Sequence, residues 1–279
     1  MTSGRLAAGV LAAGIAIFAA LLAAGYGFFV LTNPGQAIDY AAYFGRGLEA
    51  RVAVDFERHI LSWITPLHLA IAGSLMIVLS SIRRRPLTGL LAAAALFAAV
   101  FGAEWLKKNL PRSELSRAPG PVPAYFATDT YPSGHTTAGT SIAMGFILAV
   151  GFRWRWAVSV AAALASSSYA TAVLFLGWHR PSDAFGGILW SAICFGAAGL
   201  LLVLVQRPPP SPNKPGWLAS GVLFLLCTAC LAAGWWLTGD PWPPAVRDLP
   251  VAGMLTLIVI PAFATCAWLA WALAGAEEI

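Results

Sequence analysis

The sequence predicts an all-α integral membrane protein with about eight spans. The aliphatic, aromatic and sulfur residue types make up 59% of its 279 residues, and charged residues make up only 10%. Soluble domains average about 25% charged residues. Apolar runs recur along the chain at about the 20 residues that a helix needs to cross a bilayer. Alanine and glycine are frequent inside these runs, which favours close helix packing in the membrane.

This composition excludes a disordered chain, a nucleic-acid-binding domain and a water-soluble enzyme. The net charge of +5 fits basic residues retained in cytoplasmic loops of a membrane protein. We therefore expect membrane lipids as partners and no nucleic acid.

The candidate spans divide the chain into a six-span core (residues 1–206), a stiff Pro-rich linker (207–216) and a two-helix membrane extension (217–279). The first run is too long for a signal-peptide core and has no clear cleavage site, so we interpret it as an uncleaved span. The runs are Leu6–Val30, Ile60–Ile82, Pro86–Leu106, Thr136–Gly151, Trp156–Trp178, Ala184–Val205, Trp217–Leu237 and Val251–Gly275.

The segment from Leu31 to His59 joins the first two spans and has two readings. Its apolar residues recur loosely at helical intervals, which suits an interfacial helix on the outer face. A simple tether between the spans fits equally well. The apolar positions are Ile38, Ala41, Ala42, Phe44, Leu48, Val52 and Val54.

The cysteines and the loop charges bear on metals and on orientation. All four cysteines lie inside apolar runs, and Cys227 and Cys230 lack a second pair or a nearby histidine, so core packing is expected rather than a metal site.

If Arg5 is cytoplasmic, the inside loops are short and rich in arginine, which favours an N-terminus inside the cell. The composition suits a bacterial inner (plasma) membrane.

Ionisable residues gather at three span ends, which the eight-span topology places together on the outer side. One cluster, residues 104–112, leaves the third span and contains Lys107, Lys108 and Arg112. Such cations suit a phosphate, because arginine offers a planar fork and lysine a point charge. Glu104 precedes the lysines by three and four positions, so a local ion pair is expected.

The second cluster, Tyr131 to His135, enters the fourth span. Ser133 and Gly134 stand at a helix N-terminus, where free N–H groups favour an anion and glycine permits its close approach. A plain capping turn, with Ser133 as the N-cap, is the alternative.

The third cluster runs from Gly177 to Asp183 and contains Arg180. His179 and Asp183 lie four positions apart at a helix start marked by Pro181, so the carboxylate can hold one ring nitrogen and leave the other as nucleophile. Together the clusters predict phosphoryl transfer through a phosphohistidine, with His179 attacking and His135 protonating the leaving oxygen. No Cys/His/Asp set for a catalytic metal is present, and no cofactor is expected.

Pro132-Ser133-Gly134-His135 followed by His179-x-x-x-Asp183 resembles the type 2 phosphatidic acid phosphatase superfamily, which is related to vanadium haloperoxidases. The resemblance covers the first six spans. It implies a six-helix lipid phosphatase that uses no metal, with phosphate binding by Ser133 and Gly134. It also implies His135 as general acid, His179 as nucleophile and Asp183 as its orienting partner.

Two departures from the family pattern concern the phosphate-binding cations. The family's first motif has six residues between its lysine and Arg-Pro, whereas four separate Lys107 from Arg112, and Ser113 replaces the proline. Lys108 is the alternative lysine. The family arginine six residues before the catalytic histidine corresponds to Val173, so we expect Arg180 or Arg117 to replace it.

The expected function is hydrolysis of a lipid phosphate or diphosphate at the outer leaflet. Polyprenyl carriers such as undecaprenyl (di)phosphate come first, and phosphatidate-type lipids follow. A phosphotransferase using the same phosphoenzyme is one alternative. A non-catalytic lipid-binding or transport protein is another, although transporters place broken helices near the bilayer midplane and these clusters lie at span ends.

Overall fold

The computed structural model describes residues 3–45, 58–112, 130–206 and 249–274, and all regular secondary structure within these ranges is helical. The helices in chain order are α1 (Ser3–Gly25), the π-helical turn η1 (Tyr26–Val30), α2 (Asn33–Gly45), α4 (Pro66–Ile82), α5 (Pro86–Asn109), α6 (Gly134–Ala149), α7 (Phe152–Phe175), α8 (Pro181–Gln206) and α11 (Leu249–Ala274).

Five of these segments are long and apolar enough to cross a membrane: Gly4–Val30, Pro86–Asn109, Phe152–Phe175, Pro181–Gln206 and Leu255–Ala274. These long apolar helices confirm the predicted class, an all-α protein of multi-pass membrane type. The predicted count of eight is not reached within the described residues. Helix α4, with 17 residues, and α6, with 16, are shorter than a typical span. The predicted span Trp217–Leu237 and the linker lie outside the described residues.

Local capping explains why α4 is shorter than the predicted span Ile60–Ile82. The Thr65 side chain accepts a hydrogen bond from the His68 N–H, and Pro66 occupies the first helical turn. Proline and a threonine cap together mark a helix start. By contrast, Pro261 lies inside α11, which continues past it.

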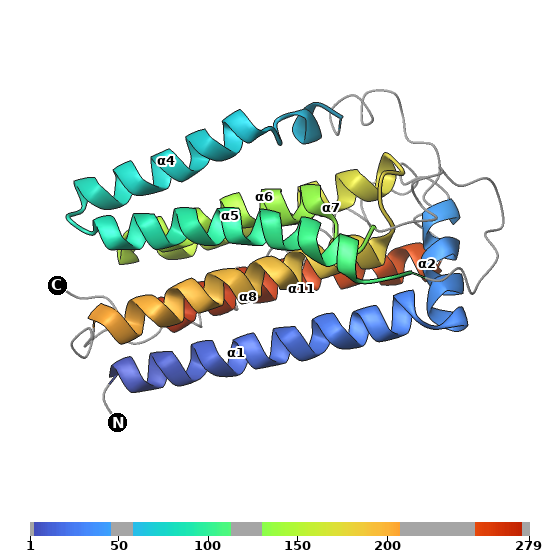
Figure 1. Cartoon of the computed structure of the whole chain (residues 1–279), viewed down its shortest axis with the longest axis horizontal. Coiled ribbons are helices and arrows are strands. Elements are labelled where there is room, and N and C mark those ends of the chain that lie inside the picture. The colour runs from blue at the N-terminus through green and yellow to red at the C-terminus, as the bar shows by residue number, and fades with distance from the viewer. Residues whose placement is uncertain (1–2, 46–57, 113–129, 207–248, 275–279) are drawn as a thin grey trace, which may run out of the picture.

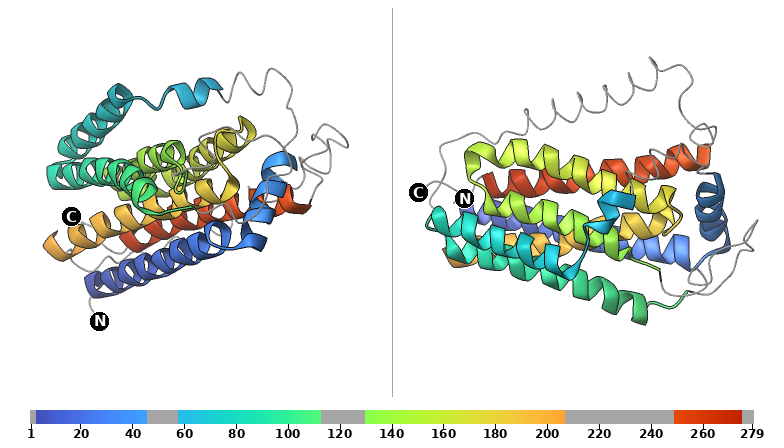
Figure 2. Two further views of the ribbon diagram at one scale, coloured as in Figure 1. Left: turned by 45° about the vertical axis from the view of Figure 1, so that its right-hand side comes forward. Right: turned by 90° about the horizontal axis from the view of Figure 1, so that it is seen from above.

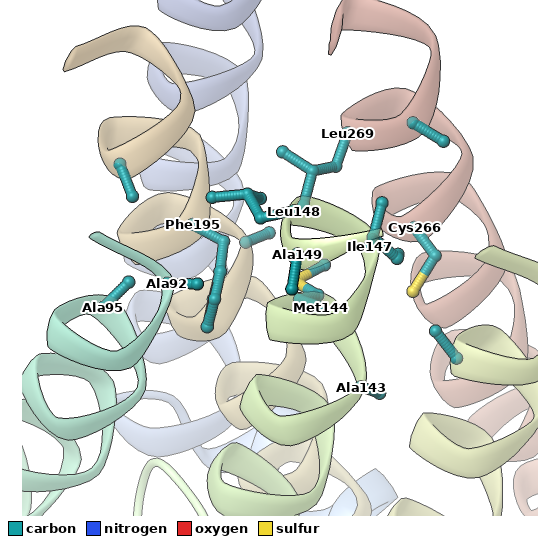
Figure 3. Close-up of a cluster of buried hydrophobic side chains, with 14 of the residues drawn as sticks. Ala92, Ala95, Ala143, Met144, Ile147, Leu148, Ala149, Phe195, Cys266 and Leu269 are labelled. Atoms are coloured by element: carbon teal, nitrogen blue, oxygen red, sulfur yellow. The ribbon is translucent and has the colours of Figure 1, made fainter. Parts of the chain in front are cut away.

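The long helices lie side by side as a bundle around α8 (Figures 1 and 2). Helix α8 packs against α1, α5, α6 and α11, and α6 packs against α5 and α7. Figure 3 shows the apolar centre, where Met144, Ile147 and Leu148 of α6 meet Phe195 of α8 and Leu269 of α11. Large apolar side chains such as Phe101 (70% exposed) also cover the outside of the bundle, as expected for a surface in contact with lipid.

Two arginines bind helix C-termini at the end of the bundle that carries the N-terminus. Arg155 is buried and donates to the carbonyls of Ile147 and Leu273, near the C-termini of α6 and α11. Arg83 donates to the carbonyl of Ala149. Cations at helix C-termini satisfy the last carbonyls and offset their negative dipole end.

Helix α2 lies across the opposite end of the bundle (Figures 1 and 2). It belongs to the segment predicted as an interfacial helix or a tether. The side that packs on the bundle is mixed, because the polar Gln36 and Asp39 are buried together with Tyr40, Ala42 and Tyr43. The predicted apolar position Ile38 is 42% exposed. The predicted positions Leu48, Val52 and Val54 lie outside the described residues.

Candidate active site

The three predicted clusters lie at the end of the bundle that α2 covers. They are carried by the C-terminus of α5, the N-terminus of α6 and the turn from α7 into α8. Helix α8 enters the protein interior at once, because every residue from Pro181 to Leu189 is buried. The polar groups of this region therefore interact inside the protein.

Ser133 is the N-cap of α6 and joins this helix to α8. Its hydroxyl oxygen accepts from the Thr136 N–H (3.3 Å), and its own N–H donates to the Asp183 carbonyl (2.8 Å). The capping alternative for Ser133 is thus realised. A phosphate role would have to use the hydroxyl proton.

Gly187 of α8 permits the close approach between the two helices. A Cβ atom there would lie 2.9 Å from the Ser133 carbonyl oxygen and 3.1 Å from the Thr136 Cβ. The first turn of α6 therefore packs directly on the α8 backbone.

Lys107 lies beside the N-terminus of α6. A Cβ atom on Gly134 would be 2.9 Å from the Lys107 ammonium nitrogen and 2.7 Å from a Glu104 carboxylate oxygen. Lys107 and Glu104 form the expected local ion pair, with Nζ and Oε1 2.6 Å apart. Lys108 is exposed. The ammonium group and the first N–H groups of α6 thus meet at one point. The Glu104 carboxylate lies there too, so an anion would have to compete with Glu104 for Lys107.

The turn between α7 and α8 presents His179. Gly177 adopts a left-handed conformation (φ 69°), and the Val173 carbonyl accepts from the N–H groups of Trp178 and His179. His179 Nδ1 lies 3.4 Å from Asp183 Oδ2, which also accepts from the Arg180 N–H at 3.0 Å. Because Asp183 engages Nδ1, Nε2 is the ring nitrogen left for chemistry.

His135 lies next to the same turn. Its ring centroid is 5.2 Å from that of Trp178, in an edge-to-face arrangement. Burial, and then the charges of His179 and Lys107, lower the pKa of His135 to about 4. His135 precedes the predicted span Thr136–Gly151. The pKa of its ring depends on both His179, the candidate nucleophile, and Lys107.

Arg112 is a buried cation between two buried carboxylates. Its side chain is 2% exposed, with Nη2 3.5 Å from Asp39 Oδ2 and Nη1 3.9 Å from Asp183 Oδ1. Within the described part of the chain, none of its guanidinium nitrogens makes a hydrogen bond. Buried donors are costly to leave unused, so this group has capacity for an anionic ligand.

Arg180, the candidate replacement for the missing family arginine, has other contacts. Its guanidinium donates to the Tyr40 hydroxyl (3.0 Å) and to Thr130 Oγ1 (3.2 Å), and it stacks over the Tyr40 ring at 4.9 Å. Val173 is fully buried in an apolar cluster, which is no environment for a cation. Arg117 lies outside the described residues.

Sequence reasoning missed Asp39 and Tyr40. Asp39 is fully buried and accepts hydrogen bonds from both the N–H and the hydroxyl of Ser182 (3.1 and 2.6 Å). Burial and the charge of Asp183 raise its pKa to about 6, against the opposing effects of Arg112 and Ser182. The available signal was the spacing of Gln36, Asp39, Tyr40 and Tyr43, which places polar groups along one face of a helix.

Comparisons with protein-family models, curated proteins and solved structures give no match. In the described residues, no group of three or more His, Cys, Asp or Glu side chains is placed to hold a metal ion. The functional reading therefore depends on the motif residues and on their geometry.

Proposed function

We propose that this protein is a metal-independent lipid phosphate or diphosphate phosphatase that acts through a phosphohistidine. One observation carries the proposal: Lys107, the N-terminus of α6, His135, the His179–Asp183 pair and Arg112 are gathered at one end of an apolar bundle. Each group alone has an ordinary structural explanation. Together they supply a nucleophile, a proton carrier and cations for one tetrahedral anion.

In the first step, His179 Nε2 attacks phosphorus while the bond from phosphorus to the leaving oxygen breaks. Asp183 stabilises the positive charge that forms on the imidazole. The leaving oxygen takes a proton from His135. General acid catalysis of this kind contributes about 10²–10⁴ in rate.

In the second step, water attacks the phosphohistidine and transfers a proton to His135. The phosphorus–nitrogen bond breaks, inorganic phosphate leaves, and His179 is restored. Lys107, Arg112 and the N–H groups of α6 stabilise the oxygens around phosphorus in both steps. Ser133, Lys108 and Arg180 remain candidate phosphate ligands.

An apolar groove supports a lipid rather than a soluble substrate. It lies between α6 and α7 and has a volume of about 420 Å³. Gly139, one helical turn beyond His135, is part of its lining, together with Ile142, Phe146, Ala162 and Tyr169. A phosphate bound at the end of α6 would leave an attached hydrocarbon chain close to this groove. Polyprenyl and phosphatidate-type lipids both have such a chain.

The test is phosphate release by the purified protein from a panel of polyprenyl and glycerolipid phosphates, in the presence of EDTA. We expect phosphate release that vanadate inhibits, and a phosphoryl label on His179 that is stable in base and labile in acid, as a phosphorus–nitrogen bond is. His179→Ala should abolish release and labelling. Loss of activity should exceed about 100-fold for His135→Ala.

The matched control is His59→Ala, because His59 is an exposed histidine that contacts Trp63 rather than the site. It should retain wild-type turnover. Inertness of the wild-type protein toward every lipid phosphate would contradict the proposal and favour a binding or transport protein. Transfer of the phosphoryl group to an added alcohol in preference to water would favour the phosphotransferase alternative.

A further inference from the structure

The two carboxylates beside Arg112, those of Asp39 and Asp183, have different hydrogen-bond partners. Asp183 already binds His179 Nδ1 and the Arg180 N–H through Oδ2. Asp39 comes from α2, outside the three sequence clusters, and has no contact with a histidine among the described interactions. Its only hydrogen-bond donors in the described structure belong to Ser182. Its remaining partner is the Arg112 guanidinium.

The geometry around Arg112 is that of an ion pair without hydrogen bonds. The guanidinium lies 3.5 Å from Asp39 and 3.9 Å from Asp183, and in the described residues its nitrogens have no acceptor. The charge of the arginine is thus balanced while its N–H groups remain available. Breaking a buried ion pair by removing one partner is strongly unfavourable, so Arg112 has to keep at least one of the two carboxylates beside it.

Removing the Asp39 charge would redirect Arg112. The guanidinium would be attracted to Asp183 alone, because that is the carboxylate that remains beside it. Asp183 would then be shared between Arg112 and His179. Both effects would damage phosphoryl transfer: the arginine would move away from the phosphate, and the nucleophile would lose part of its orienting partner.

We infer that Asp39 is a positioning residue of this site, which holds the Arg112 guanidinium on the α2 side so that Arg112 stays available to the phosphate and Asp183 stays available to His179. The inference rests on the proposed function for its catalytic consequence. Its physical content, a coupling between Asp39 and Arg112 in anion binding, can be measured separately.

The experiment is a double-mutant cycle in detergent with Asp39→Asn and Arg112→Gln, which each remove one charge of the pair. Asparagine has the shape of aspartate and can still accept from the Ser182 N–H, but it lacks the charge. Three quantities are measured for each variant: the Kd of orthovanadate by calorimetry, and kcat and KM with dioctanoyl phosphatidic acid. Thermal melting identifies any variant that has not folded.

Asp39→Asn should weaken vanadate binding by about tenfold in the wild-type background and have little effect in the Arg112→Gln background, because charges in direct contact couple and the second background has no charge at position 112. We expect kcat/KM to fall by about 100-fold, the loss that a small misplacement of a catalytic group produces. The fall should reside partly in kcat, which a residue that only stabilises α2 would not affect after folding.

Ser182→Ala is the matched control for a purely structural role. It removes one hydrogen bond between α8 and Asp39 but leaves the carboxylate charge beside Arg112. If Ser182→Ala reproduces the losses of Asp39→Asn, or if Asp39→Asn has equal effects in both arginine backgrounds, the inference is overturned while the phosphatase proposal stands.

The reverse outcome is also distinguishable. A protein that binds vanadate with the predicted Asp39–Arg112 coupling but releases no phosphate would contradict the phosphatase proposal and support the inference. A protein that neither binds vanadate nor turns over substrate would overturn both.

Discussion

At the scale of single residues, His135 poses a problem of protonation. Its low pKa means that the ring is neutral near pH 7, yet a general acid must carry a proton. A bound phosphate dianion would offset the positive charge of Lys107 and stabilise the imidazolium form of His135. His135 would then gain its proton when the anion binds.

Proton uptake by His135 is therefore expected when the protein binds an oxyanion. Above the pKa of about 4 the free His135 ring is unprotonated, and binding raises that pKa, so uptake should be present at pH 7 and disappear as the pH falls below 4. The measurement is vanadate-binding calorimetry at pH 7 in buffers of different ionisation enthalpy. His135→Gln should take up fewer protons than the wild type. Equal uptake by the two proteins would remove His135 from the acid role.

At the scale of elements, the first turn of α6 is held by two glycines with different neighbours. A Cβ on Gly134 would meet the ends of the flexible Lys107 and Glu104 side chains, whereas one on Gly187 would meet the backbone of Ser133 and Thr137. Flexible side chains can move aside, but packed backbone cannot. A substitution at Gly134 should therefore affect anion binding, whereas a substitution at Gly187 should affect the stability of the fold.

Gly134→Ala should displace Lys107 and weaken vanadate binding by about tenfold, as expected for loss of one charge-assisted contact, with little change in Tm. Gly187→Ala should destabilise the protein by about 1–3 kcal/mol through overpacking. Thermal melting and calorimetry on both variants test this contrast. Gly9→Ala is the control, since a Cβ there has no neighbour within 4 Å. A large Tm loss for Gly134→Ala would contradict the assignment.

Helix α2 shows how an element can escape a search for apolar periodicity. Four of its buried residues have hydrogen-bond partners. Gln36 donates to the Val30 carbonyl and Tyr43 to the Gly177 carbonyl. Asp39 accepts from Ser182 of α8, and the Tyr40 hydroxyl accepts from Arg180 in the turn before α8. The apolar spacing left an interfacial helix and a simple tether equally open, and the structure has a helix over Asn33–Gly45. The spacing could not indicate that Gln36 and Asp39 would be buried, because that depends on partners far away in the sequence.

At the scale of the whole molecule, the candidate site and the N-terminus lie at opposite ends of the bundle (Figure 1). If the N-terminus is inside the cell, the site faces the exterior. Single cysteine substitutions at exposed polar positions can test this orientation. Asn109→Cys lies at the site end and Arg153→Cys at the other end, and both positions are exposed.

In intact spheroplasts, a membrane-impermeant thiol reagent should label Asn109→Cys and leave Arg153→Cys unlabelled until the membrane is permeabilised. The parent chain is the control, because the described cysteines Cys194 and Cys266 are not exposed. The opposite labelling pattern would place the site in the cytoplasm. It would exclude a role at the outer leaflet without affecting the proposed chemistry.

Hydrophobicity and spacing, which are local properties of the chain, were sufficient to predict the helical membrane class and the approximate positions of the helices. Because consecutive spans alternate in direction, the sequence also predicted that three helix ends lie on one side of the membrane. These are the C-terminus of α5, the N-terminus of α6 and the C-terminus of α7. Local chemistry also predicted the Glu104–Lys107 ion pair, the N-cap at Ser133 and the His179–Asp183 pair, since each lies within one helical turn.

Only the tertiary structure decided which distant groups form ion pairs and hydrogen bonds with these residues. Asp39 and Arg112 are brought together because α2 folds across the end of the bundle. For the same reason the Tyr40 hydroxyl accepts a hydrogen bond from the Arg180 guanidinium. Burial turns these contacts into strong interactions by excluding water, and the burial of a polar side chain depends on the whole packed assembly rather than on its sequence neighbours.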